Sequence, residues 1–157
     1  MHSYEQAFEA SLEYFKQDKL AANVFVSKYA LQDSEGQWIE LSPDDMHKRL
    51  AREFSRIESK YKNPMSEDDI YNLLKDFKYI VPQGSPMSGI GNEIKIQSLS
   101  NCFVIEPPYD SYGGILKTDQ EQVQIMKRRG GVGFDISSIR PKGLITSNAA
   151  KTTDGIE

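Results

Sequence analysis

Cysteine, histidine and long apolar runs are scarce in this chain of 157 residues, and each scarcity excludes a class of protein. The single cysteine, Cys102, cannot form an internal disulfide, and the two histidines, His2 and His47, do not complete a zinc site. No stretch of about 18 apolar residues marks a membrane span, and the charged, periodic N-terminus is unlike a signal peptide. We therefore expect a cytoplasmic protein with no membrane segment and no bound metal.

An excess of basic residues is also missing. The formal net charge is −4, and 27% of the residues are charged. Proteins that bind nucleic acid usually carry a strong basic excess, so the run Lys127–Arg129 is a local feature and we expect no nucleic-acid partner. With 38% hydrophobic residues, the chain can bury one modest core.

The first half of the chain is predicted to be helical. Apolar residues recur at helical spacing in two pieces over residues 3–31. Ser42 and Pro43 are typical of a helix start, and Ser66 begins another helix in the same way. On the first of these helices, Arg49 and His47 are expected to face water. Residues 1–80 therefore read as a helical region without chemistry.

The character changes at VPQGSPMSGIGN (81–92), whose glycines and prolines predict an irregular loop. Ser85 on this loop could hydrogen-bond a phosphate or a sugar, or it could simply form a structural turn. Residues 95–106 are predicted to be a buried strand that contains Cys102. A cysteine on a strand is either a small buried hydrophobe or a reactive thiol, and both remain open.

A second helix and strand follow. The capping box Thr118–Glu121 predicts a helix to about residue 129, and the glycines of 130–133 lead into a strand at Phe134–Ile136. This order, from helix to glycines to strand, is the reverse of a dinucleotide fingerprint, and the chain lacks the Gly-Lys-Ser/Thr of a Walker loop. We expect these glycines to let a ligand or a neighbouring strand approach the backbone.

Two cations lie in the next loop, IRPKG (139–143). Arg140 can bind a phosphate in bidentate fashion, and Lys142 adds a second charge. A thiol, bare glycine backbone and fixed positive charge together suggest a small-molecule site. From the residues alone, an enzyme and a non-catalytic helical interaction module with a nucleotide-binding loop both remain open.

Four motifs carry a resemblance to a known family. SLSNCFV (98–104), Asp110-Ser111, RRGGVGFD (128–135) and IRPKG (139–143) resemble, in order and spacing, the opening of the large catalytic subunit of ribonucleotide reductase. The helical lead-in at 20–58 resembles the adenosylcobalamin-dependent (class II) branch. A class I subunit, served by a separate metal-containing radical protein, is the alternative within the family.

The resemblance implies a fold and an activity. The fold is α/β, with a helical N-terminal region (1–80) leading into the first strands of a ten-stranded α/β barrel (81–157) that is incomplete in this chain. The activity is reduction of ribonucleotides to deoxyribonucleotides for DNA replication, by thiyl-radical chemistry with a redox cysteine pair. Adenosylcobalamin would be bound by residues beyond this chain.

The resemblance also assigns residues. Cys102 matches the first redox cysteine, and Ser85, Asn101, Cys102 and Gly131 match positions that hold the substrate nucleotide. Effector-binding positions, for a deoxynucleotide or ATP at a homodimer interface, are Asp110, Ser111, Arg140 and Lys142. One departure is Ser147, where some family members carry a second effector-binding arginine; Lys142 or Lys151 are alternative sources of charge.

Several parts of the family machinery are expected beyond Glu157. These are the radical cysteine, the second redox cysteine, the cobalamin-contacting surface and the cysteines that exchange with a thioredoxin-type reductant. We therefore expect the chain to be inactive alone and to be marginally stable, self-associating or bound to the remainder of the catalytic subunit.

Overall fold

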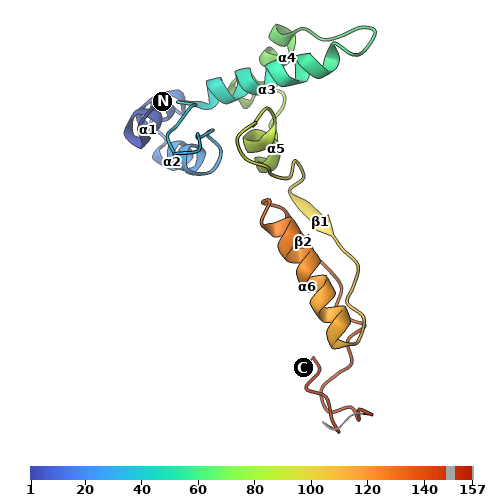
Figure 1. Cartoon of the computed structure of the whole chain (residues 1–157). Helices are drawn as coiled ribbons and strands as arrows, with labels where there is room; N and C mark the ends of the chain where they lie inside the picture. Colours follow the sequence, from blue (N-terminus) through green and yellow to red (C-terminus); the bar gives the residue numbers. More distant parts are fainter. Residues whose placement is uncertain (148–150, 157) are drawn as a thin grey trace. The chain divides into compact units, whose positions relative to one another are not determined.

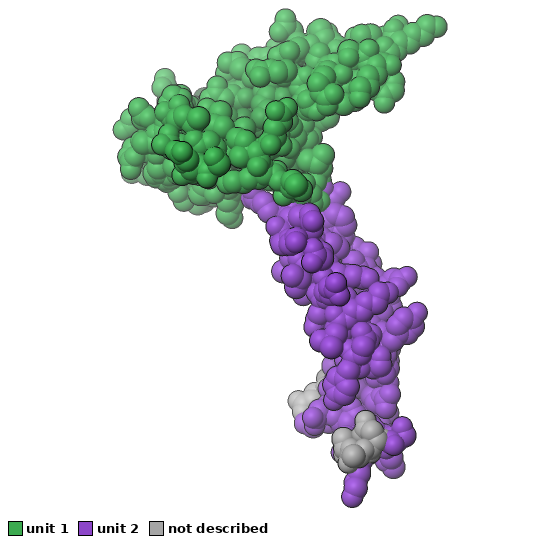
Figure 2. All heavy atoms as spheres, viewed as in Figure 1, with its two compact units in different colours: residues 1–99 green, residues 100–157 purple. Residues whose placement is uncertain are grey.

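The computed structural model describes residues 1–147 and 151–156 and divides the chain into two compact units. Unit 1 comprises residues 1–99 and unit 2 comprises residues 100–157 (Figure 2). This division falls later than the boundary expected after residue 80, which stays a prediction for the domains of a complete subunit. Each unit is described by itself below.

Unit 1 is helical (Figure 1). Its N-terminal pair is interrupted where Lys16 and Gln17 adopt positive φ angles of 51° and 72°, which confirms the predicted two helical pieces. Ser42 is the N-cap of the long central helix, as its sequence predicts, and its backbone amide donates to Oδ2 of Asp45 at 3.3 Å. The elements are α1 (Tyr4–Tyr14), α2 (Lys19–Lys28), α3 (Pro43–Glu58), α4 (Glu67–Leu74), the 3-10 turn η1 (Lys75–Phe77) and α5 (Gly84–Gly89).

The core of unit 1 lies where α1, α2, α3 and α4 pack together. Trp38 lies against this core, and its indole Nε1 donates a hydrogen bond to the carbonyl of Val26 at 3.0 Å. Apolar positions at helical spacing supply this core, but Leu20 of α2 and Phe54 of α3, which share that spacing, are 74% and 40% exposed. The buried cluster is Ala7, Phe25, Val26, Met46, Leu50, Ala51, Ile70 and Leu74.

Unit 1 differs from its sequence-based description at three places. His47 and Arg49 were expected to face water, and both are buried. Residues 84–89 were expected to be irregular, and they form α5. The proline of this segment, Pro86, is tolerated because it lies in the first turn, where an N–H has no partner within the helix.

Unit 2 contains two short parallel strands joined by a helix. These are β1 (Cys102–Val104), α6 (Tyr112–Met126) and β2 (Gly131–Gly133). The register pairs Cys102 with Gly131, Phe103 with Val132 and Val104 with Gly133. A helical region followed by parallel strands confirms the predicted fold class.

The predicted element bounds in unit 2 need correction. The strand expected over 95–106 is confined to Cys102–Val104, and Val104 is 91% exposed, so it is not buried here. The second strand is formed by the glycines at 131–133 rather than by Phe134–Ile136. A parallel strand with little side-chain bulk can approach its neighbour closely, which the pattern of apolar residues did not reveal.

The helix of unit 2 also begins earlier than its capping box predicts. Ser111 is the N-cap, accepting a hydrogen bond from the amide of Gly114 at 3.0 Å, and Thr118 is an interior, buried residue. Gly114 is required by packing, because a Cβ there would lie 2.4 Å from the carbonyl oxygen of Tyr109. Across the part of the chain that the structure describes, no helix has the length and apolar character to cross a membrane.

Candidate functional site

The thiol of Cys102 lies at the start of β1 and is exposed. Its strand partner is Gly131, whose amide donates to the carbonyl oxygen of Asn101 at 2.6 Å. The strand pairing therefore brings together three of the predicted substrate residues, Asn101, Cys102 and Gly131. The exposed thiol counts against the alternative in which Cys102 is a small buried hydrophobe.

Glycine at position 131 keeps the space beside this thiol open. A Cβ at position 131 would lie 3.9 Å from Sγ of Cys102 and 3.2 Å from the carbonyl oxygen of Asn101. Any larger side chain would therefore stand in van der Waals contact with the sulfur. The neighbouring Gly130 has a different role, since a Cβ there would lie 2.5 Å from Cγ2 of Ile125 and 2.8 Å from Cε2 of Phe103. Gly130 thus allows α6 to pack closely on β1.

The predicted effector residues Asp110 and Arg140 form an ion pair in unit 2. Nε of Arg140 lies 2.5 Å from Oδ2 of Asp110, and the backbone amide of Arg140 donates to Oδ1 at 3.4 Å. Both side chains are about one-third exposed, at 37% for Arg140 and 33% for Asp110. The pair thus joins the start of α6 to the loop after β2 while leaving charged surface open to a ligand.

The other predicted effector residues lie nearby in the sequence and have structural partners. The Ser111 hydroxyl accepts the capping hydrogen bond of α6. The Lys142 amide donates to the carbonyl of Ile156 at 3.1 Å, so the loop that carries it is fastened to the end of the described chain. On the same loop, Ser137 donates its hydroxyl to Asp135 at 2.6 Å, and this hydrogen bond lowers the pKa of the Asp135 carboxyl.

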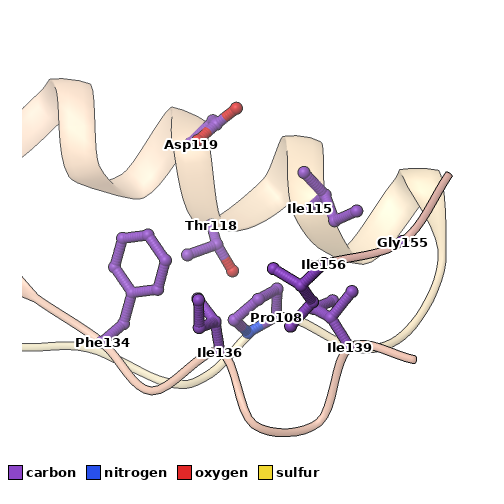
Figure 3. A pocket seen from close by; sticks show the side chains of 9 residues that line it. All are labelled: Pro108, Ile115, Thr118, Asp119, Phe134, Ile136, Ile139, Gly155 and Ile156. Carbon is purple, nitrogen blue, oxygen red and sulfur yellow. The ribbon is translucent and has the colours of Figure 1, made fainter. Parts of the chain in front are cut away.

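An apolar pocket of about 170 Å³ lies between α6 and this loop (Figure 3). Thr118 and Ile115 of α6 form one side, and the side chain of Asp119 points away from the apolar cluster. Gly155 is needed here, because a Cβ would lie 2.4 Å from the amide nitrogen of Lys142. The lining residues are Pro108, Ile115, Thr118, Asp119, Phe134, Ile136, Ile139, Gly155 and Ile156.

Sequence reasoning missed the pocket residues Thr118, Gly155 and Ile156. Thr118 was interpreted as a helix cap because it fits a capping box. The Asp-Gly pair at 154–155 is a turn signal that could have indicated the returning segment. That segment pairs back on the loop, where Gly143 donates its amide to the carbonyl of Thr153 at 2.8 Å.

Ser85, the remaining predicted substrate residue, lies in unit 1. It is the second residue of α5 and is 6% exposed. Its carbonyl accepts a hydrogen bond from Nε2 of Gln97 at 3.1 Å. Because Ser85 and Cys102 belong to different units, the structure does not join them in one site, and the role of Ser85 stays a prediction.

Two family models match this chain. One is described as "Ribonucleotide reductase, all-alpha domain" and matches residues 15–90. The other is described as "Ribonucleotide reductase, barrel domain" and matches residues 100–157. The two matched regions follow the division between the helical unit and the unit with parallel strands.

Individual relatives agree with the family models. The chain is 26% identical over 138 residues to a vitamin B12-dependent ribonucleoside-diphosphate reductase of Mycobacterium tuberculosis, a match that covers 86% of this chain and 19% of the relative. It is 27% identical over 123 residues to the ribonucleoside-diphosphate reductase large chain of Encephalitozoon cuniculi, covering 77% of this chain and 15% of that one.

A third relative matches a shorter region. Large chain 2 of the Saccharomyces cerevisiae ribonucleoside-diphosphate reductase is 38% identical over 58 residues, covering 37% of this chain and 7% of the relative. The chain thus spans about a fifth, or less, of the length of the curated relatives it matches. With both of its units matched in order by domains of one enzyme, this chain belongs to the ribonucleotide reductase large-subunit family.

Proposed function

We propose that this chain is the N-terminal part of a ribonucleotide reductase catalytic subunit and supplies one thiol of its redox cysteine pair. The observation that carries the proposal is the exposed Cys102 thiol, paired in register with the bare backbone of Gly131. In the overall reaction one thiol hydrogen replaces the 2′-hydroxyl on C2′, the other leaves with that hydroxyl as water, and the two sulfurs join in a disulfide. Cys102 is one of these thiols, and the second belongs to polypeptide outside this chain.

The residues around Cys102 fit this role. Asn101 offers a side-chain amide and Gly131 a backbone without a side chain, and both lie within the same strand pairing as the thiol. Polar groups of this kind are suited to the phosphate and ribose of a nucleotide. We assign the hydroxyl of Ser85 to the same substrate.

An exposed thiol can be tested on the chain itself. Cys102 should react at once with an aromatic disulfide reagent in the folded chain, because its sulfur is open to solvent. Gly131→Val should slow this reaction by placing a branched side chain against Sγ, and Gly133→Val, where nothing lies within 4 Å of a Cβ, is the matched control. A thiol that reacts only after unfolding would contradict the proposal.

The catalytic role needs a complete catalytic subunit that carries these residues. Cys102→Ser should abolish turnover with a thioredoxin-type reductant, because serine cannot form the disulfide, and should leave effector binding intact. Unchanged turnover would remove Cys102 from the mechanism.

We propose a second, regulatory site at Asp110, Ser111, Arg140 and Lys142 for a deoxynucleotide or ATP effector. The Asp110–Arg140 ion pair supports it, because both side chains keep exposed surface. The Arg140 guanidinium can therefore bind a phosphate while it remains paired with Asp110. Arg140→Ala should weaken effector binding by about 1–3 kcal/mol, the scale of a charged hydrogen bond. Calorimetry that shows no loss would defeat this assignment.

For the radical source we propose adenosylcobalamin, as in the class II branch. The relative from Mycobacterium tuberculosis is named vitamin B12-dependent, which supports this choice. When bound to the complete subunit, the cofactor would supply the radical that the cysteine chemistry requires, and we assign none of the described residues to it. The chain is similar at 27% identity to the large chain from Encephalitozoon cuniculi, and a class I subunit is the alternative. Turnover that requires added cobalamin and no second metal protein would decide between them.

The remaining partners follow from the same proposal. We propose a ribonucleotide substrate, a homodimer of complete subunits, a thioredoxin-type reductant and a cytoplasmic location. Mass measurement of the complete subunit with and without effector tests the dimer, because the effector is expected to bind at its interface.

A further inference from the structure

A buried ion pair in unit 1 contacts the helix that carries Ser85. Arg49 of α3 and Glu40, in the segment before α3, are 9% and 4% exposed. Nε of Arg49 donates to Oε1 of Glu40 at 2.6 Å, and Nη2 donates to Oε2 at 3.3 Å. Burial of two charges is costly unless further hydrogen bonds satisfy their remaining donors and acceptors. The other hydrogen-bond partners of Arg49 and Glu40 therefore show which segments of the chain this ion pair holds in place.

The remaining donors of Arg49 go to the C-terminal end of α5. Nη2 also donates to the carbonyl of Met87 at 2.7 Å, and Nη1 donates to the carbonyl of Ile90. Ile90 is the C-cap of α5. Carbonyls in the last turn of a helix lack partners within it, so Arg49 supplies donors to groups that the helix itself does not satisfy.

Other contacts keep the Arg49 side chain in place. Oε2 of Glu40 accepts the amide of Leu31 at 2.8 Å, which ties the carboxylate to the backbone that follows α2. Gly91, at a positive φ of 71°, packs over the stem of Arg49, since a Cβ there would lie 3.0 Å from Cγ of Arg49. The guanidinium is therefore fixed from the side of the carboxylate and from the side of the loop.

Helix α5 depends on such contacts because it has only six residues. Isolated helices of this length are not stable in water. Gln97 holds α5 through the carbonyl of Ser85 and the hydroxyl of Ser88, at 3.1 and 2.9 Å. Arg49 adds a charged contact at the C-terminal end of the helix, through the carbonyls of Met87 and Ile90.

We infer that Arg49, oriented by Glu40, is a positioning residue that fixes α5 and with it the position of Ser85, which is 6% exposed. This inference rests on the proposed role of Ser85 in substrate binding. A residue of the helical region, outside the four short motifs at 98–104, 110–111, 128–135 and 139–143, then determines how well the substrate is held.

The first test measures backbone hydrogen exchange in the chain itself. The double variant Glu40→Gln/Arg49→Met keeps an amide oxygen for the Leu31 amide and fills the space with an apolar side chain, but it removes the donors to α5. Amides of Met87 and Ile90 should exchange about tenfold faster or more, while amides of α1 keep their rates. Arg49→Lys, which keeps the charge and loses the planar fork, should give a smaller increase and serves if the double variant is poorly folded. Unchanged exchange at Met87 and Ile90 in both variants would overturn the inference.

The second test uses a complete catalytic subunit with these residues. Arg49→Lys should raise the KM for the ribonucleotide several-fold and leave effector binding unchanged. Combined with Ser85→Ala, it should add nothing to the effect of Ser85→Ala alone, because Arg49 acts through Ser85. Additive effects would overturn the positioning role. If Ser85→Ala leaves KM unchanged, the proposed function of Ser85 is wrong, and the exchange rates alone then decide whether Arg49 positions α5.

Discussion

The two units differ in how much of their apolar surface is buried. Among the described residues, every member of the buried hydrophobic core belongs to unit 1, and unit 2 buries Pro108. Unit 2 leaves large apolar side chains in water, with Tyr112 84%, Ile145 87% and Val104 91% exposed. Burial of apolar surface is the main favourable term in folding. Unit 1 therefore gains this stabilisation from its own core, and unit 2 gains little of it.

The comparison shows that the proposed redox chemistry lies in the unit with the smaller core. Cys102 and Gly131 are held by two short parallel strands and one helix. Parallel sheets are normally covered on both faces, and open strand edges readily pair with further strands. We therefore expect unit 1 to fold by itself and unit 2 to be completed by further polypeptide. The predictions below test this difference, from the largest expected effect to the smallest.

The ion pairs of the two units should respond differently to the same change. Arg49→Met leaves Glu40 buried without its cation and should lower the free energy of unfolding by about 3–5 kcal/mol. Arg140→Met breaks a pair that is about one-third exposed and should cost about 0–1 kcal/mol. Urea denaturation of both variants measures the two losses, and equal losses would refute the comparison.

Leucines provide a second matched pair. Leu50 on α3 is fully buried, so Leu50→Ala should destabilise unit 1 by about 2–5 kcal/mol. Leu116 on α6 is 65% exposed, so Leu116→Ala should change stability by about 0.5 kcal/mol or less. Thermal unfolding followed by circular dichroism provides the test. A large loss from Leu116→Ala would mean that unit 2 buries this face against a partner in solution.

Two glycines test the packing of unit 2. Gly130→Ala should separate α6 from β1, because the new Cβ would overlap Ile125 and Phe103, at a cost of about 1–3 kcal/mol. Gly133→Ala meets nothing within 4 Å and should be nearly neutral. Loss of the nuclear Overhauser contact between the backbones of Cys102 and Gly131 in the first variant alone would confirm this. If both variants keep the contact, Gly130 is not required by packing.

Acid should destabilise unit 1 through His47. Burial lowers the pKa of this histidine, and the nearby Asp44 and Asp76 offset burial only in part. The unfolded chain then takes up a proton at its ordinary pKa of about 6.5 while the folded chain does not, so stability is full above that pH and falls as the pH drops below it. The maximal slope is about 1.4 kcal/mol per pH unit.

A matched pair of histidine variants isolates this effect. His47→Leu should remove the loss of stability between pH 6.5 and about 5, whereas His2→Gln should retain it. Chemical denaturation at several pH values measures the slope for each. An unchanged slope in His47→Leu would assign the acid sensitivity to another group.

Helix positions in unit 1 could be predicted because their signals lie in the local sequence. The capping serines and the apolar spacing of residues 43–58 identify α3 without tertiary information. Whether an individual polar residue is buried or exposed could not be predicted in the same way. Arg49 is buried because its partners, Glu40 and the carbonyls of α5, come from other parts of the chain. His47 is buried against Phe77, which lies in η1, at a ring distance of 4.6 Å.

In unit 2 the motifs predicted which residues lie side by side better than they predicted where the strands begin and end. Cys102 and Gly131 were predicted for one site, and the strand register does pair them. The same glycines were expected to precede the second strand, although they form it. Side-chain patterns cannot identify a strand whose residues are mostly glycine, because the signal for a strand is the alternation of side chains.

The connection between β1 and β2 has a consequence for which sequence changes the chain can accept. The length of helix α6 determines which backbone group of β2 lies beside the sulfur of Cys102. One residue deleted from it would turn the rest of the helix by about 100° and exchange the sheet faces of the following residues. Substitutions on the outer face of α6 should therefore be tolerated, while single insertions and deletions there should not.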